Sequence, residues 1–224
     1  LGYNDVEGLR LRLGGRTYFG QNDMWRLEGF GAYGFKDEKF KYGLSGKVLL
    51  SKKNRKILFG GHRKDIEQTG ASLTNSNDVL GRNRASSGLV TIGANDRLTN
   101  IELFTLGYEM EPAKNFIFRI TGSHRTLKSA SDTFSLSYYD KNGAINDELK
   151  QSELELGINY TPGRKTSGYG VERKIINQGD FPSFFLGYTF GLENVLKSDF
   201  DYHRIQTLYT QPWNVGGLGR LYTT

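Results

Sequence analysis

Residues 7–16 read Glu7-Gly8-Leu9-Arg10-Leu11-Arg12-Leu13-Gly14-Gly15-Arg16, and this stretch decides the fold class. Leucines take every second position, and arginines or glycines fill the positions between them. Because successive side chains of a β-strand point to opposite faces, the stretch predicts a strand with one apolar and one polar face.

The same two-residue period recurs along most of the chain. Ten or eleven strands of about 8–12 residues are predicted, which indicates an all-β, antiparallel fold. The clearest further segments are 24–35, 40–50, 104–110, 116–121, 134–138, 154–160 and 184–190, and weaker ones are 57–67, 201–210 and 217–224. Such strands exceed the usual length of about five to six residues and are long enough to cross a bilayer when tilted.

Composition excludes several classes of protein. The 224 residues contain 30 Lys and Arg against 24 Asp and Glu, a net charge of +6, and no Cys. A disulfide-stapled domain, a zinc–thiolate site and a cysteine nucleophile are therefore excluded. No segment reaches the roughly 18 apolar residues of a membrane helix, whereas transmembrane strands leave little trace in average hydropathy.

The two faces of the predicted strands leave two orientations open. The apolar faces are rich in Phe, Tyr and Trp near strand ends, as in the aromatic girdles of a transmembrane β-barrel, and the interspersed charges opposite would line a wet lumen. The predicted lumen-facing residues are Arg10, Arg12, Arg26, Glu28, Lys41, Lys47, Arg119, Glu153 and Glu155, and Glu102 is assigned to the same face. The alternative is a soluble β-rich ligand-binding module, lipocalin-like or a sandwich, with the polar face in water.

The predicted connections are polar. Tight turns are expected at 20–23, 36–39, 51–56 and 111–115, and long loops at 69–100 and 162–182. Long loops in compact domains are usually functional or disordered. The one candidate helix covers residues 76–82.

No motif points to chemistry. The glycines Gly29, Gly31 and Gly34 match a dinucleotide-binding spacing, but they lie inside a predicted strand rather than before a helix. His62, His124 and His203 are far apart in sequence. No catalytic residue, metal site or cofactor is predicted, and an enzyme acting on lipid or glycan would rest only on scattered acidic and histidine side chains. The cations are dispersed, which disfavours a nucleic-acid partner and suits contact with anionic lipid or lipopolysaccharide.

Four stretches resemble a known family. They are residues 6–17 (VEGLRLRLGGRT), 31–43 (GAYGFKDEKFKYG), 65–70 (DIEQTG) and 217–224 (GLGRLYTT). Together they resemble the barrel domain of large Gram-negative outer-membrane proteins of unknown function, which carry an N-terminal carboxypeptidase-regulatory-like domain. That barrel is distantly similar to the 16-stranded up-and-down barrels of the outer-membrane insertase and translocase superfamily.

The resemblance sets the expected organisation and role. Residues 1–224 would be an internal portion of one outer-membrane β-barrel domain, with further chain on both sides. We expect a non-enzymatic integral protein of the Gram-negative cell outer membrane that assists the assembly or export of envelope proteins or glycans. Its expected partners are outer-membrane lipid, lipopolysaccharide, and other outer-membrane or periplasmic proteins.

Overall fold

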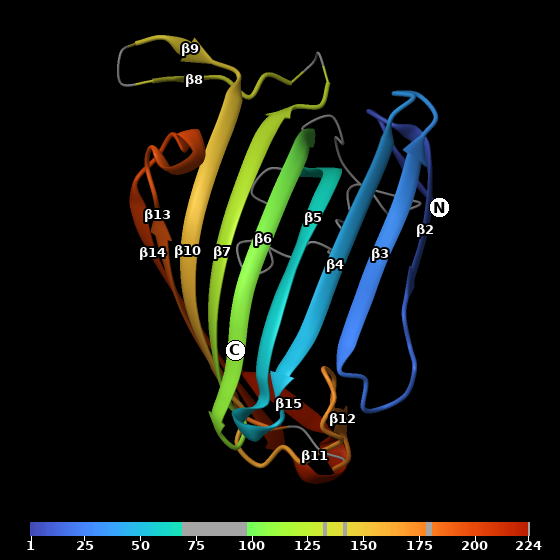
Figure 1. Cartoon of the computed structure of the whole chain (residues 1–224), viewed down its shortest axis with the longest axis vertical. Helices are drawn as coiled ribbons and strands as arrows, with labels where there is room; N and C mark the ends of the chain where they lie inside the picture. Colours follow the sequence, from blue (N-terminus) through green and yellow to red (C-terminus); the bar gives the residue numbers. More distant parts are fainter. Residues whose placement is uncertain (69–97, 132–133, 141–142, 178–180, 224) are drawn as a thin grey trace.

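The computed structural model describes residues 1–68, 98–131, 134–140, 143–177 and 181–223, which form one large antiparallel sheet and two small hairpins (Figure 1). The sheet order is β1-β2-β3-β4-β5-β6-β7-β10-β13-β14-β15, so each strand pairs with the sheet strands that precede and follow it in the chain. The described residues contain no α-helix. The predicted all-β, antiparallel fold is confirmed. The first and last strands of the described sheet do not pair, so this sheet is open.

The strands are long. The sheet consists of β1 (Gly2–Asn4), β2 (Gly8–Arg16), β3 (Trp25–Gly34), β4 (Phe40–Ser51), β5 (Lys56–Gln68), β6 (Leu98–Ala113), β7 (Phe116–Ser129), β10 (Glu148–Tyr160), β13 (Ser183–Gly191), β14 (Tyr202–Asn214) and β15 (Arg220–Thr223). The hairpins are β8 (Tyr138–Tyr139) with β9 (Ile145–Asn146), and β11 (Thr166–Ser167) with β12 (Lys174–Ile175). Three short 3-10 turns are η1 (Lys53–Arg55), η2 (Val195–Lys197) and η3 (Gly216–Leu218).

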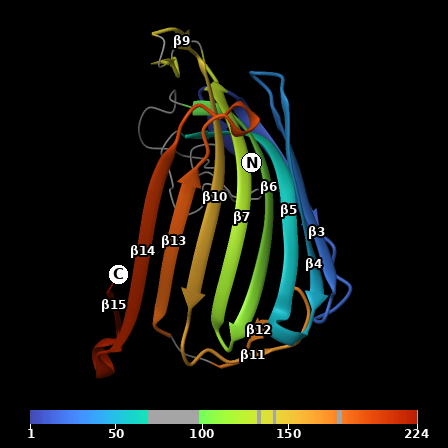
Figure 2. The same ribbon diagram turned by 60° about the vertical axis from the view of Figure 1, so that its left-hand side comes forward.

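The meander places its connections alternately at two ends, and the sheet curls about its long axis (Figure 2). We call the end with the β3–β4 turn, the β8–β9 hairpin and η2 the upper end, as drawn in Figure 1. The lower end carries η1, the β6–β7 turn and the β11–β12 hairpin. At that β6–β7 turn Asn115 has a φ of 62°, a left-handed conformation that Asn tolerates better than most residues.

The structure corrects three sequence predictions. Residues 134–138 do not form a sheet strand, because β7 pairs directly with β10 and leaves them no free edge; only a bridge from Ser131 to Phe134 and the two-residue β8 form there. Strand β6 begins at Leu98, inside the predicted loop 69–100. The short β1 was not predicted. The candidate helix at 76–82 lies outside the described residues.

Most of the buried apolar side chains of the described residues form three small clusters. Val6, Ile66 and Leu98 form one cluster, and Leu49, Ile57 and Val171 form another. The third consists of Ile101, Leu103 and Leu127. Much of the remaining buried surface is polar or charged, which is unusual for a soluble domain. No helix in the described part of the chain is long and apolar enough to span a membrane.

Candidate functional site

The two faces of the sheet differ sharply in burial and polarity. On β2, Arg10 is 1% exposed, whereas Leu13 on the opposite face is 84% exposed. The Arg10 guanidinium reaches Asp65 on β5 at 2.8 Å, past the two intervening strands β3 and β4. Two side chains can meet over intervening strands only on the concave face of a curved sheet. The polar face is therefore the inward face, and the leucine face is the outward one.

All nine residues predicted to share the polar face do so by strand register. For example, Arg26 pairs with Lys47 across the ladder, so these two side chains share one side of the sheet. Glu155 pairs with Thr121, which lies two residues from Arg119 on β7, so Glu155 and Arg119 also share that side. Their burial varies: Arg10, Arg26, Lys41 and Glu153 are buried, Arg12, Glu28, Lys47 and Glu155 are half-buried, and Arg119 is exposed. They do not converge on one point. Arg10, Arg26, Lys41, Arg119 and Glu153 form ion pairs in several separate groups, and the Arg12 guanidinium lies over the Phe30 ring.

Glu102 is the exception to the predicted polar face. It lies two residues from Phe104 on the same strand and therefore shares the outward face. Its carboxylate is 3.2 Å from the Nε2 atom of His62, and it is paired across the ladder with Lys64. The assignment of Glu102 to the inward face was wrong because it followed residue charge rather than the two-residue period.

An ion cluster at the upper end is centred on Glu7. Its carboxylate accepts from Arg10 at 2.9 Å and from Lys41 at 2.6 Å, and it also accepts from the Asn4 amide at 2.7 Å. Lys41 has a second partner in Asp37 at 2.6 Å. The cluster thus contains two cations, Arg10 and Lys41, and three carboxylates, Glu7, Asp37 and Asp65. Each charged group has a partner of opposite sign, which offsets the cost of its burial. Sequence reasoning found Arg10 and Lys41 but missed Glu7, which was included in the predicted strand 7–16 and which the structure places in the turn before β2.

A second cluster joins side chains of β7, β10 and β14 on the inward face. Arg125 pairs with Glu153 at 2.8 Å, and the Tyr202 hydroxyl donates to the same carboxylate. Tyr202 is on β14, so its ring must pass over β13 to reach β10. The position beneath it is Gly191, where a Cβ atom would lie 2.3 Å from the Tyr202 ring. The missing side chain of Gly191 thus permits this contact across a strand.

The long connection after β10 crosses the lower end of the sheet toward β3, β4 and β5 (Figure 1). We call residues 161–177 the strap. Its Val171 is 3% exposed and packs on Leu49 and Ile57, and the Val171 amide donates to the Asp23 carbonyl at 2.8 Å. The Arg55 guanidinium donates to the Val171 carbonyl at 2.5 Å. The predicted long loop is therefore a docked segment that joins β10 to the lower ends of β3, β4 and β5.

Ion pairs reinforce the strap on both sides. Glu172 pairs with the inward Arg26, and Arg173 pairs with Glu111 at the end of β6. Arg55, in η1, sits against Glu109 at 2.9 Å. Burial lowers the pKa of Arg55, and nearby Arg173 adds to this, although Glu109 opposes it. Arginine remains charged at physiological pH even so, and these contacts persist.

The histidines do not form a catalytic or metal centre. The His124 Nδ1 atom is 2.9 Å from the Ser152 hydroxyl, but that hydroxyl donates to the Val195 carbonyl and is buried. The pair thus holds η2 against β10 and does not present an activated nucleophile. His203 contacts the Tyr188 hydroxyl instead. No group of three metal-ligating side chains gathers within the described residues.

Above the strands, the β8–β9 hairpin is tied to the η2 connection. The Tyr138 ring packs against Phe200, with ring centroids 5.3 Å apart and ring planes tilted by 49°. Burial, together with the hydrogen bond and negative charge of Asp199, raises the pKa of Tyr138 to about 12. Tyr138 therefore stays a neutral hydrogen-bond donor at physiological pH.

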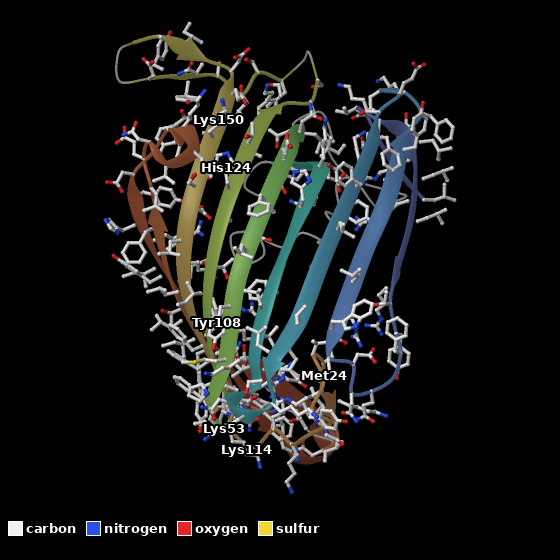
Figure 3. The ribbon with its side chains drawn as sticks, in the orientation of Figure 1. Met24, Lys53, Tyr108, Lys114, His124 and Lys150 are labelled. Atoms are coloured by element: carbon white, nitrogen blue, oxygen red, sulfur yellow. The ribbon has the colours of Figure 1, made fainter. Side chains whose placement is uncertain are left out.

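The outward face is an apolar band with a polar upper border. On β6 it runs from Phe104 to Met110, with Tyr108 in its lower half (Figure 3). Register brings Lys64, Glu102, Thr126 and Lys150 into one row above this band. Many large side chains of the band are exposed. Apolar patches of this extent are rare on monomers in water.

One family matches the chain over residues 1–224, and its description is "Family of unknown function (DUF5686) C-terminal domain". No curated protein and no solved structure matches. The match agrees with the coarse part of the resemblance drawn from the sequence, a family of unknown function. It does not bear on an N-terminal regulatory-like domain or on a likeness to insertases.

Proposed function

The chain belongs to the DUF5686 family as its C-terminal domain, and for this domain we propose the role of a transmembrane β-barrel wall in the Gram-negative outer membrane. The outward face of the sheet contacts lipid acyl chains, and the inward face lines a polar interior. The role is non-enzymatic and assists the assembly or export of envelope proteins or glycans. This last part extends the resemblance seen in the sequence to the insertase and translocase barrels.

A single observation carries the proposal: the sheet has its charged side chains buried and its large apolar side chains exposed. Arg10 and Lys41 are buried among carboxylates, while Leu11 and Leu44 on the opposite face are exposed. In water this arrangement is unfavourable, because the hydrophobic effect opposes the exposure of large apolar side chains. In a bilayer the same arrangement is favourable, because lipid covers the apolar face and the interior can hold charge.

The height of the apolar band fits a membrane. On β4 the outward apolar residues extend from Phe40 to Leu50. Ten residue steps measure roughly 34 Å along a strand. A tilt of about 40° reduces this to roughly 26 Å across the membrane, close to the apolar band of about 25 Å in known barrels. Exposed aromatic residues at both borders, such as Trp25 and Phe40, suit the interfacial girdles.

The cysteine-free chain offers a direct test of which face meets lipid. Leu44→Cys and Ser45→Cys are neighbours on β4 with opposite orientations. Each variant of the full-length protein is labelled with a polarity-sensitive fluorophore and reconstituted with lipids that carry a nitroxide in the acyl chain. We expect strong quenching at position 44 and weak quenching at position 45.

Two outcomes would contradict the proposal. Equal quenching at both positions would mean that the outward face does not contact acyl chains. A protein that stays monomeric in plain buffer and migrates identically on gels with and without boiling would instead support the soluble β-rich module. Faster migration of the unboiled, membrane-extracted protein is the expected result for a closed barrel.

A further inference from the structure

Exposed lysines gather at the lower end of the sheet. They come from the β4–β5 connection, the β6–β7 turn and the strap, which are separate in sequence and adjacent in space. Lys53 and Lys114 mark this end in Figure 3. The exposed lysines of the lower end are Lys52, Lys53, Lys56, Lys114, Lys165 and Lys174.

The carboxylates of the lower end form ion pairs with arginines. Glu111 pairs with Arg173, and Glu172 pairs with Arg26. Glu109 pairs with both Arg55 and Arg119. These internal ion pairs leave the positive charge of the lysine ammonium groups facing outward.

The upper end has the opposite charge. Its described connections carry nine carboxylates and three lysines. Four of these carboxylates are exposed, those of Asp5, Glu38, Asp147 and Asp201. The described part of the chain is thus polarised along its strands, with a basic lower end and an acidic upper end. Scattered surface charge would not produce this separation.

Large apolar and aromatic side chains border the lysines. Met24, Trp25, Tyr160 and Tyr169 are exposed at the lower end. The Lys52 ammonium lies 3.9 Å from the centroid of the Tyr169 ring. Aromatic rings and lysines together are typical of the boundary between acyl chains and headgroups, where lysine stems lie along apolar surface and their charges reach the polar layer.

From these features we propose that the lower end binds the phosphate groups of anionic membrane lipids. The inference rests on the proposed membrane position and adds to it which end faces an anionic headgroup layer. The lysines bind phosphate as mobile point charges, without a preformed pocket. Each exposed lysine near an anionic surface is expected to strengthen binding about fivefold, and salt should weaken the interaction.

The test compares two triple variants of the full-length protein that change the net charge equally. One is Lys53→Gln/Lys114→Gln/Lys174→Gln at the lower end. The control is Lys39→Gln/Lys128→Gln/Lys197→Gln, which are exposed lysines at or near the upper end. Binding is measured in neutral detergent micelles by displacement of a fluorescent phosphatidylglycerol. The competitors are phosphatidylglycerol, phosphatidylcholine with the same acyl chains, and water-soluble glycerol phosphate.

We expect the wild type and the upper-end variant to prefer phosphatidylglycerol over phosphatidylcholine. The lower-end variant should bind phosphatidylglycerol on the order of 100-fold more weakly. Glycerol phosphate should compete only weakly, since it lacks the membrane anchor. Equal binding of the two lipids by the wild type, equal loss in both variants, or full competition by glycerol phosphate at the same concentration would each overturn the inference.

The mobility of the unboiled protein on gels is measured on the same samples and separates the two proposals. A protein with shifted mobility but no preference for the anionic lipid would overturn this inference and leave the membrane position standing. A protein with no mobility shift that binds anionic vesicles from plain buffer would overturn the membrane position instead.

Discussion

Arg10 and Leu11 are consecutive residues of β2 in opposite surroundings. Arg10 is buried and holds two carboxylates, Glu7 and Asp65, whereas Leu11 is exposed on a face of leucines and aromatic residues. In a soluble β-sandwich the two environments would be exchanged, with the leucine in the core. The contrast teaches that ion pairs order the inward face, whereas the exposed apolar side chains of the outward face are the ones that lipid would cover under the proposed function.

The largest expected effect comes from removing Glu7, the carboxylate at the centre of the ion cluster on the inward face. Glu7→Ala leaves Arg10 and Lys41 buried with one fewer carboxylate. Breaking a buried ion pair by removing one partner costs about 3–5 kcal/mol. We expect a loss of this size in the free energy of unfolding, measured by urea titration in micelles.

The matched control is Asp147→Ala, which removes an exposed carboxylate from the same end. It should change the free energy of unfolding by less than about 0.5 kcal/mol. If both variants lower the free energy of unfolding by the same amount, Glu7 behaves as a solvated surface carboxylate. The charges of the inward face would then not be what orders it.

The next variant places a charge on the outward face. Leu11→Arg should destabilise the protein by about 2–4 kcal/mol if residue 11 lies near the bilayer midplane. Leu9→Arg, nearer the upper end of the same strand, should cost less, because the cost of charge falls toward the interface. Unfolding titrations in lipid vesicles measure both, and Leu11→Ile is the apolar control. Equal stability of Leu11→Arg and wild type would indicate that Leu11 faces water.

The strands and their polarity could be predicted because both depend on local sequence. The period of two in residues 7–16 requires only that neighbours point to opposite faces, so the sequence sufficed to place Arg10 and Arg12 on the same face of one strand. The contacts between strands were not predictable in this way. The Arg10–Asp65 pair depends on the curvature of four strands, and the Tyr202–Glu153 contact depends on a glycine in the strand between them.

The strap illustrates the same limit. Its composition is that of an ordinary polar loop, and its aliphatic residues are Val171, Ile175 and Ile176. Val171 is buried, but Ile175 and Ile176 are exposed. What fixes the strap is a set of partners on β3, η1 and β6, which are brought to one end by the meander. Sequence spacing alone does not encode that convergence.

Truncation of the strap's apolar anchor should have a smaller effect than either charge variant. Val171→Ala removes two methyl groups from the contact with Leu49 and Ile57 and should cost about 1–3 kcal/mol locally. Hydrogen exchange at the Val171 amide, which donates to Asp23, should accelerate by roughly five- to 100-fold. Val195→Ala, at an exposed site in the upper-end turn η2, is the control and should leave this amide unchanged. Unchanged exchange in Val171→Ala would mean that the strap is held by its ion pairs alone.

The smallest expected effect concerns an ion pair outside the inward face. Lys128 and Glu148 are 3.3 Å apart near the upper end, and the Lys128 side chain is 57% exposed. Exposed pairs contribute about 0–1 kcal/mol, since water screens both charges and the long side chains lose freedom. Lys128→Ala should therefore lower the free energy of unfolding by less than about 0.5 kcal/mol, against about 3–5 kcal/mol for Glu7→Ala. A cost for Lys128→Ala near that of Glu7→Ala would place the upper border of the apolar band inside the membrane, because only a medium of low dielectric strengthens an exposed pair to that degree.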